Sequence, residues 1–266
     1  MLTFNQYRKV TSLEEAYELN QKKANKIIGG MLWMKMGARN IGTAIDLSGL
    51  GLDKIEETED EFSIGCMTSL RDLELHPGLD AYTGGAMRES LRHIVGVQFR
   101  NVATVGGSIF GRFGFSDVLT MFLALDSYVE LYKGGIVSMD QFADMERDND
   151  ILVRIIVRKT PLSVVYLSHR NTKTDFPVIA CAVVQMEQRI KAVIGARPYK
   201  ACIVWDNDDI LKEGISLESA KAFGEYVVHH VKTGSNMRGS KEYRSHLIKV
   251  FVRRGCQMLG GEQNAN

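Results

Sequence analysis

The 266-residue sequence lacks the cysteine spacing that metal centres require. Its four cysteines, Cys66, Cys181, Cys202 and Cys256, lie far apart, and no C-x-x-C pair occurs. Zinc ions and iron–sulfur clusters are normally ligated by closely paired cysteines. We therefore predict that the chain holds no metal and that its thiols are structural side chains.

The sequence also lacks a long apolar run and an excess of one charge. No stretch approaches the roughly 20 apolar residues that a membrane-spanning helix needs, and residues 1–19 contain charged side chains that a signal peptide would not carry. With 33 basic and 32 acidic residues the formal net charge is +1, whereas nucleic-acid binding normally needs a strong basic excess. These features predict a cytoplasmic protein with no membrane span and no nucleic-acid partner.

The standard nucleotide-binding motifs are missing as well. Gly49-Leu50-Gly51 does not continue as G-x-G-x-x-G, because Lys54 occupies the last position. The segment 234–241 comes close to a P-loop, but its serine and lysine stand in the wrong order. A Rossmann or P-loop fold is therefore disfavoured.

Hydrophobic patterning predicts an α+β fold. Strands and helices are mixed up to residue 160, four strands then form an antiparallel meander, and two helices follow at 217–230 and 241–258; this order differs from the regular alternation of a doubly wound sheet. The domains are expected at residues 1–160 and 161–260, with a frayed tail at 261–266. The earlier strands are expected at residues 26–28, 43–47, 62–65, 128–132 and 151–157, with Ile55 on the hairpin partner of residues 62–65, and residues 101–115 are expected to be largely loop.

Two Gly-Gly pairs stand out, in Ile27–Leu32 and in Arg100–Ser108. Glycine lets backbone N–H groups converge and a ligand approach closely, which suits phosphate oxygens. Two such loops can clamp a pyrophosphate. The alternative is that both pairs are ordinary turns, and spacing alone does not identify FAD.

The second glycine segment carries a family resemblance. Arg100–Ser108, followed by Ser116-Asp117, resembles the R-N-x-A-T-[IV]-G-G-N and Ser-Asp signature of the FAD-binding subunits of molybdenum hydroxylases, which include xanthine dehydrogenase and carbon monoxide dehydrogenase flavin subunits. The Gly29-Gly30 loop resembles the family's A-G-G-T loop. Further similar segments are Ile45–Ser48 (I-D-L-S), Ile64–Thr68 (I-G-A-x-T) and Met237–Arg244 (D-x-R-[AG]-S-x-x-Y-R).

The resemblance implies a vanillyl-alcohol oxidase/PCMH-type FAD-binding domain of two subdomains, followed by a small C-terminal domain with an antiparallel sheet and helices. The first glycine loop would wrap the diphosphate and part of the flavin, the second would hold the diphosphate from the other side, and Asp117 would bond ribityl or adenosine hydroxyls. The implied cofactor-binding residues are Ile27, Ile28, Gly29, Gly30, Met31, Leu32, Trp33, Ile94, Val95, Thr104, Val105, Gly106, Gly107, Ser108, Asp117, Leu152 and Tyr166.

Two residues depart from the family pattern at the implied site. Met31 replaces a small hydroxyl residue or histidine, and Ser108 replaces asparagine. Loss of two hydrogen bonds, at about 0.5–1.5 kcal/mol each, would weaken cofactor binding without abolishing it. For nearby Arg112 a solvated side chain is favoured over contact with a phosphate or a partner.

A flavin carries its own redox chemistry, so no catalytic residue of the protein is expected. The resemblance implies an oxidoreductase subunit of xanthine dehydrogenase type, which takes electrons from [2Fe-2S] clusters on a partner subunit, works beside a molybdopterin-binding subunit, and passes electrons through FAD to NAD, a quinone, ferredoxin or oxygen. Two alternatives stay open. One is a stand-alone flavin oxidoreductase, and the other is a flavin-free scaffold that bridges the iron–sulfur and molybdopterin subunits.

Overall fold

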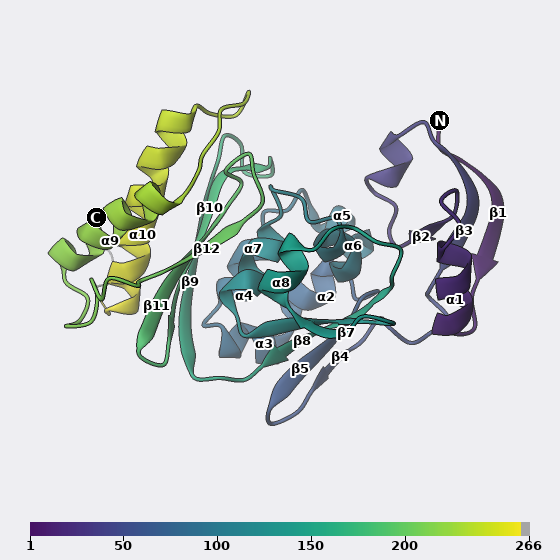
Figure 1. Cartoon of the computed structure of the whole chain (residues 1–266), viewed down its shortest axis with the longest axis horizontal. Coiled ribbons are helices and arrows are strands. Elements are labelled where there is room, and N and C mark those ends of the chain that lie inside the picture. Colours follow the sequence, from purple (N-terminus) through teal and green to yellow (C-terminus); the bar gives the residue numbers. More distant parts are fainter. Residues whose placement is uncertain (262–266) are drawn as a thin grey trace. The chain divides into compact units, whose positions relative to one another are not determined.

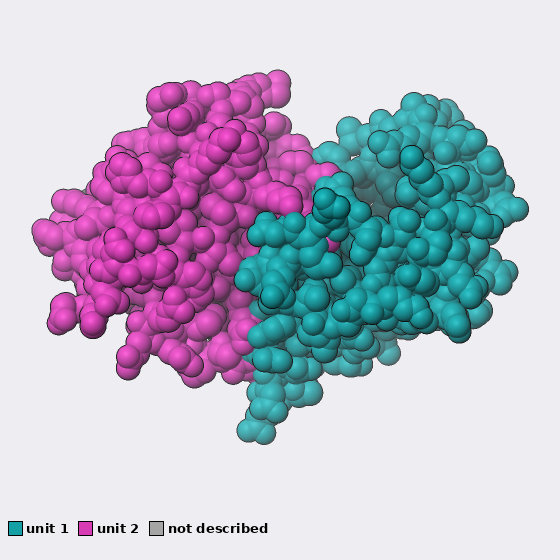
Figure 2. Space-filling view, viewed as in Figure 1, with its two compact units in different colours: residues 1–73, 97–111, 127–158 teal, residues 74–96, 112–126, 159–266 magenta. Residues whose placement is uncertain are grey.

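The computed structural model describes residues 1–261, and the chain divides into two compact units (Figures 1 and 2). Unit 1 contains residues 1–73, 97–111 and 127–158, and unit 2 contains residues 74–96, 112–126 and the chain from 159 onwards. The units therefore do not coincide with the expected division at residue 160, because helices from the first half of the chain pack with the C-terminal segment. The expectation for the tail at residues 262–266 lies outside the described part of the chain.

Unit 1 begins with a small parallel sheet in the order β1-β3-β2. Its elements are β1 (Thr3–Lys9), α1 (Leu13–Asn20), β2 (Lys26–Ile28), the 3-10 helix η1 (Met34–Met36) and β3 (Asn40–Asp46). The central strand β3 buries its apolar residues, as its sequence predicts. Strand β1 was not predicted, because all seven of its residues are exposed and no alternation of buried apolar side chains marks it.

The second sheet of unit 1 has five antiparallel strands in the order β4-β5-β8-β6-β7. Ile55 lies opposite Ile64, which confirms the predicted hairpin. The apolar strand β8 occupies the centre of the sheet, as expected for a sequence with few polar residues. The strands are β4 (Ile55–Glu57), β5 (Glu61–Gly65), β6 (Ser127–Leu131), β7 (Gly135–Ser138) and β8 (Leu152–Arg158), and the associated helices are α2 (Leu70–Leu75), α5 (Val97–Val102), α6 (Val105–Phe110) and α8 (Met139–Asp144).

The prediction of a loop over residues 101–115 was wrong for residues 101–102, which end α5, and for residues 105–110, which form α6. Helix α6 includes both Gly106 and Gly107, although glycine disfavours helix interiors by about 1 kcal/mol. Thr104 offsets this cost as the N-cap, because its Oγ1 accepts a hydrogen bond from Gly107 N at 3.2 Å. Tertiary contacts thus outweigh the local preference for a turn.

Unit 2 contains a four-stranded antiparallel sheet in the order β12-β11-β10-β9, which confirms the predicted meander. Helices α9 and α10 cover one face with an apolar core, and α4 and α7 lie against the other face (Figure 1). All eight residues of α7 are buried. The elements are α3 (Pro77–Tyr82), α4 (Ala86–Leu91), α7 (Asp117–Ala124), β9 (Leu162–Arg170), β10 (Pro177–Met186), β11 (Arg189–Gly195), β12 (Cys202–Trp205), α9 (Leu217–His230) and α10 (Lys241–Leu259). No helix in residues 1–261 is both long and apolar enough to cross a membrane.

A fully buried arginine joins α10 to the segment before it. Arg244 has an exposed fraction of 0%. Its guanidinium donates to the carbonyls of Val178 and Gly234, each at 2.8 Å, to the carbonyl of Gly239, and to Asn236 Oδ1 at 2.7 Å. One side chain thus binds four acceptors, two of which, the Gly239 carbonyl and Asn236 Oδ1, also accept from the backbone N–H groups of Asn236 and Arg238.

We expect Arg244→Met to lower the free energy of unfolding by about 3 kcal/mol or more, because methionine keeps much of the volume but satisfies none of the four acceptors. Urea denaturation followed by circular dichroism measures this loss. The control Arg254→Met changes an exposed arginine of the same helix and should stay within about 0.5 kcal/mol of the wild type. Equal midpoints for both variants would contradict the role given to Arg244.

The cysteines lie in different parts of the fold and form no disulfide. Burial raises the pKa of Cys66 and of Cys256 to about 12, and also raises the pKa values of Cys181 and the partly buried Cys202. Since the thiolate is the reactive form, these thiols react slowly at pH 8. We expect a disulfide exchange reagent such as DTNB to label at most one thiol, Cys202, in the native protein, and four after unfolding. Fast native labelling of three or four thiols would contradict this burial.

Candidate cofactor-binding site

The two glycine segments touch each other within unit 1. The turn after β2 places Gly29 against Thr104, and a Cβ built on Gly29 would lie only 2.6 Å from Thr104 Oγ1. A Cβ on Gly30 would overlap the carbonyl group of Val102. The structure thus brings together the two segments that the sequence analysis expected to face each other.

The reason for the first glycine pair differs from the one that we expected. At Gly30 a Cβ would meet the carbonyl group of Val102, and at Gly29 it would meet the Thr104 side chain, so no space for a diphosphate remains between these residues. Gly106 has a similar role, since its Cβ would lie 2.7 Å from both the Cβ and the carbonyl oxygen of Cys66. A ligand must therefore lie along the rim of the joined loops.

The N–H groups at the start of α6 do not form the predicted open nest. Val105 N donates to the carbonyl of Thr68 at 2.9 Å, Gly106 N to the carbonyl of Cys66 at 2.8 Å, and Gly107 N to Thr104 Oγ1. Gly107 nevertheless has an open face, because a Cβ there would approach only Thr104 Oγ1, at 3.1 Å. At this segment a ligand can therefore come close to the backbone of Gly107, but it finds no free N–H donors at residues 105–107.

The loop after β2 retains its donors. Among the described residues, the N–H groups of Gly30, Met31 and Leu32 have no hydrogen-bond acceptor within the chain. Met31 adopts a left-handed backbone with φ 55°, and a left-handed residue in a turn directs successive N–H groups towards one point, where an anion can bind. Trp33 ends the loop with its ring 6.4 Å from that of Phe99 in an edge-to-face arrangement. These donors fit the anionic diphosphate of a dinucleotide.

Asp117 and Tyr166 meet inside unit 2. The Tyr166 hydroxyl and the Arg170 guanidinium both donate to Asp117 Oδ1, each at 2.6 Å. Burial raises the pKa of Asp117, although Arg170 and Tyr166 pull it down. Burial and the neighbouring carboxylate raise the pKa of Tyr166, so the phenol keeps its proton and acts as a donor. Arg170 was missed in the sequence analysis, although its spacing of four from Tyr166 places both on one face of β9.

The remaining predicted residues differ in accessibility. Val95 is 44% exposed and has φ 51°, a strained conformation for a β-branched residue. Ile94 is partly buried beside it, while Leu152 is buried in β8. The interpretation of Arg112 as a solvated side chain was wrong, because only 4% of this residue is exposed.

Fold and site together define an α+β class of cofactor-binding protein without a Rossmann motif. In this class the Gly29-Gly30 turn after β2 packs against the N-terminus of α6, which Thr104 caps. The sequence profile described as "FAD binding domain in molybdopterin dehydrogenase" matches residues 2–159, and the chain belongs to this family. FAD is the cofactor of this domain.

Known proteins resemble the chain over nearly its whole length. The uncharacterized protein YgfM of Escherichia coli (strain K12) is 25% identical over 97% of this chain and 98% of its own. The nicotine 6-hydroxylase medium subunit of Paenarthrobacter nicotinovorans is 26% identical over 93% of this chain and 94% of its own. A chain of the carbon monoxide dehydrogenase of Hydrogenophaga pseudoflava, 21% identical, shares the fold with a TM-score of 0.84 over 94% of this chain and 95% of that chain.

We expect Gly30→Ala to lower the free energy of unfolding by about 1–3 kcal/mol, because the added methyl group forces the two loops apart. Chemical denaturation measures the change. Gly37→Ala is the matched control, since Gly37 has an extended backbone and a Cβ there would approach only the carbonyl oxygen of Met34, at 3.3 Å. If both variants unfold at the wild-type midpoint, the backbone contact does not have the importance assigned to it.

Proposed function

We propose that this chain is the electron-transfer flavoprotein subunit of a molybdenum hydroxylase complex of xanthine dehydrogenase type. In this proposal it receives electrons from [2Fe-2S] clusters on a partner subunit and passes them to an acceptor such as NAD. The observation that carries the proposal is the close approach of the two glycine segments, with Gly29 against Thr104 and Gly30 against Val102, inside the region that matches the FAD-binding family. FAD, when bound, supplies the exchange of one and two electrons.

The residues of the chain bind and orient the cofactor. The N–H groups of Gly30, Met31 and Leu32 donate to the diphosphate, and the open face of Gly107 lets it approach α6. For unit 2, the family resemblance assigns cofactor contacts to Asp117, which Tyr166 and Arg170 hold in place, and to Ile94 and Val95. Leu152 contributes through backbone atoms, because its side chain is buried.

The proposal needs partner chains. The proposal assigns the iron–sulfur clusters to another subunit, and in residues 1–261 no group of three or more His, Cys, Asp or Glu side chains is arranged to hold a metal. The nicotine hydroxylase relative is by its name a medium subunit, which supports an arrangement of this kind. A molybdopterin-binding subunit would complete the assembly in the cytoplasm.

A scaffold without flavin is the second candidate. It is favoured by the internal hydrogen bonds of Val105, Gly106 and Gly107, which leave fewer donors for a diphosphate than the family resemblance implies. Absorption near the flavin maxima in the purified chain, with release of FAD on denaturation, decides between the two. A colourless chain that takes up no added FAD leaves only the scaffold.

We expect Gly107→Val to weaken FAD binding at least tenfold, about 1.4 kcal/mol, because its side chain would occupy the open face of α6. Titration of the apoprotein with FAD, followed by fluorescence quenching, measures the affinity. Gly37→Val places the same side chain at an exposed extended position nearby and should bind FAD like the wild type. Wild-type affinity in Gly107→Val, with an unchanged circular dichroism spectrum, would remove Gly107 from the site.

A further inference from the structure

The segment between α9 and α10 folds into a tight hairpin at its centre (Figure 1). Asn236 N donates to the Gly239 carbonyl at 3.1 Å, and Gly239 N donates to the Asn236 carbonyl at 3.2 Å. Arg244 bonds the same two residues from the protein interior. The hairpin is therefore stabilised by its own backbone hydrogen bonds and by the buried Arg244 guanidinium.

A second arginine fixes the hairpin from the side. The Arg238 guanidinium pairs with both carboxylate oxygens of Asp175, with Nη2 3.0 Å from Oδ1 and Nε 3.2 Å from Oδ2. It also lies 4.8 Å from the centre of the Phe176 ring. Asn171 donates to the Arg238 carbonyl at 3.1 Å. The hairpin consequently has little conformational freedom to lose on binding.

Met237 projects from this rigid hairpin into solvent. Its exposed fraction is 92%, and among the exposed large hydrophobic residues of the described chain only Met1, at the chain end, has a higher value. An apolar side chain held in water gains free energy when a partner covers it, and methionine adapts to irregular partner pockets. Met237 is preorganised, because Arg244 binds Asn236 before it and Asp175 binds Arg238 after it. A fixed, exposed methionine of this kind is suited to contact with another protein.

The surface around Met237 is basic. The stretches 171–176, 196–200 and 231–243 contain six lysine or arginine residues and only two acidic residues, Asp175 and Glu242, whereas the whole chain has a net charge of +1. Arg238 neutralises Asp175 and lowers the pKa of its carboxyl group. This excess favours a partner that carries carboxylates.

Tyr199 extends the surface beyond the hairpin. Its ring is 41% exposed and lies 4.9 Å from Lys232 Nζ and 5.5 Å from the Arg197 guanidinium. Gly234 connects this group to the hairpin, because Gly234 N donates to the Arg197 carbonyl at 3.1 Å. Aromatic residues beside cations are typical of the energetic centre of protein interfaces.

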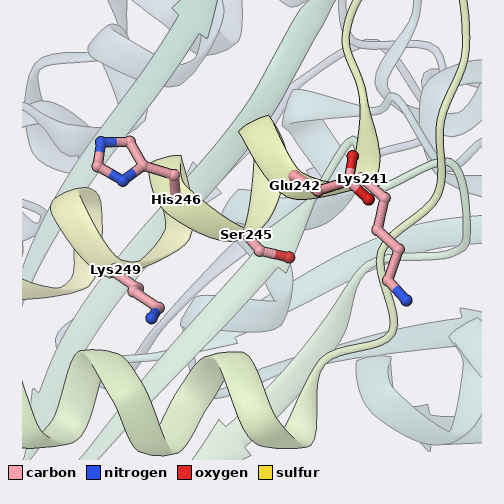
Figure 3. A pocket seen from close by; sticks show the side chains of 5 residues that line it. All are labelled: Lys241, Glu242, Ser245, His246 and Lys249. Carbon is pink, nitrogen blue, oxygen red and sulfur yellow. The ribbon is translucent and has the colours of Figure 1, made fainter.

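A polar hollow on α10 lies next to the hairpin in the sequence and begins at Lys241 (Figure 3). Ser245 points from α10 towards the preceding segment, where its hydroxyl is 3.1 Å from that of Thr233. Lys249 points towards α9 and pairs with Glu225 at 2.5 Å. The hollow is lined by Lys241, Glu242, Ser245, His246 and Lys249.

We propose that Met237, Tyr199 and the hollow at Lys241 form one docking surface for a second polypeptide with an apolar socket rimmed by carboxylates. Met237 enters the socket, and Lys232 and Lys241 pair with the rim. The inference rests on the proposed function, in which the chain works beside other subunits. The polypeptide with the carboxylate-rimmed socket is then one of those subunits.

The experiment uses the full-length chain, co-expressed with the candidate [2Fe-2S] and molybdopterin-binding subunits of the same organism. Light scattering after size exclusion identifies the assembly, and titration of the purified subunits measures its affinity. Met237→Asp should weaken association at least tenfold, because the carboxylate enters an acidic rim. Lys232→Glu should act in the same direction, and both effects should shrink at high salt.

Met258→Asp is the matched control, because Met258 is an exposed methionine at the far end of α10. Each variant should keep the wild-type unfolding temperature and the wild-type flavin content. Four results would overturn the docking surface: wild-type affinity in Met237→Asp, no assembly of the wild-type chain with either subunit, an effect confined to self-association, or an effect confined to nucleic-acid binding.

Flavin absorption separates this inference from the proposed function. A colourless chain that still assembles through Met237 would refute the flavoprotein and leave the docking surface standing. A yellow chain whose association with the partner subunits is unchanged by Met237→Asp would refute only the docking surface.

Discussion

The site of unit 1 depends on the close approach of two segments, because Gly30 lies against the Val102 carbonyl group and Gly29 lies against the Thr104 side chain. The second stretch is itself anchored, since Leu70 N donates to the Ala103 carbonyl at 2.8 Å and Ser69 bridges Thr104. The parallel sheet, the turn after β5 and α6 are thereby fixed with respect to one another. A loop with free N–H donors, such as the one at Met31, keeps its shape only on such a support.

Buried arginines have the corresponding role in unit 2. Arg170 binds Asp117 with one nitrogen and the Asp175 carbonyl, at 2.6 Å, with another, while Arg238 binds the Asp175 carboxylate. Arg244 continues the series on the other side of the hairpin. A chain of charge-assisted hydrogen bonds thus runs from a predicted cofactor ligand to an exposed surface, and each member limits the rotamers of the next.

The sequence was informative wherever a periodic apolar pattern faced a core. The meander β9–β12, the helices α9 and α10, and the hairpin that pairs Ile55 with Ile64 follow from such patterns. It was uninformative for β1, which is exposed throughout, and misleading for α6, where the Thr104 cap and contacts with the turn at Cys66 outweigh two glycines. The sequence predicted that the two glycine segments face each other. It did not show why glycine is needed at position 30, because the proximity of Val102 arises only in the folded chain. Arg170 was missed because ion pairs across 53 residues leave no local trace.

The interleaving of the two units has a consequence for how the polypeptide can be divided. Helix α7 buries all eight of its residues and packs on β10 and β11, which are encoded more than 50 residues later. A fragment that stops at residue 159, the end of the matched family region, would expose this helix to water and leave it prone to aggregate. During synthesis, α7 therefore becomes buried only after the C-terminal sheet has been made. A gene fragment that encodes residues 1–159 alone should not give a stably folded protein.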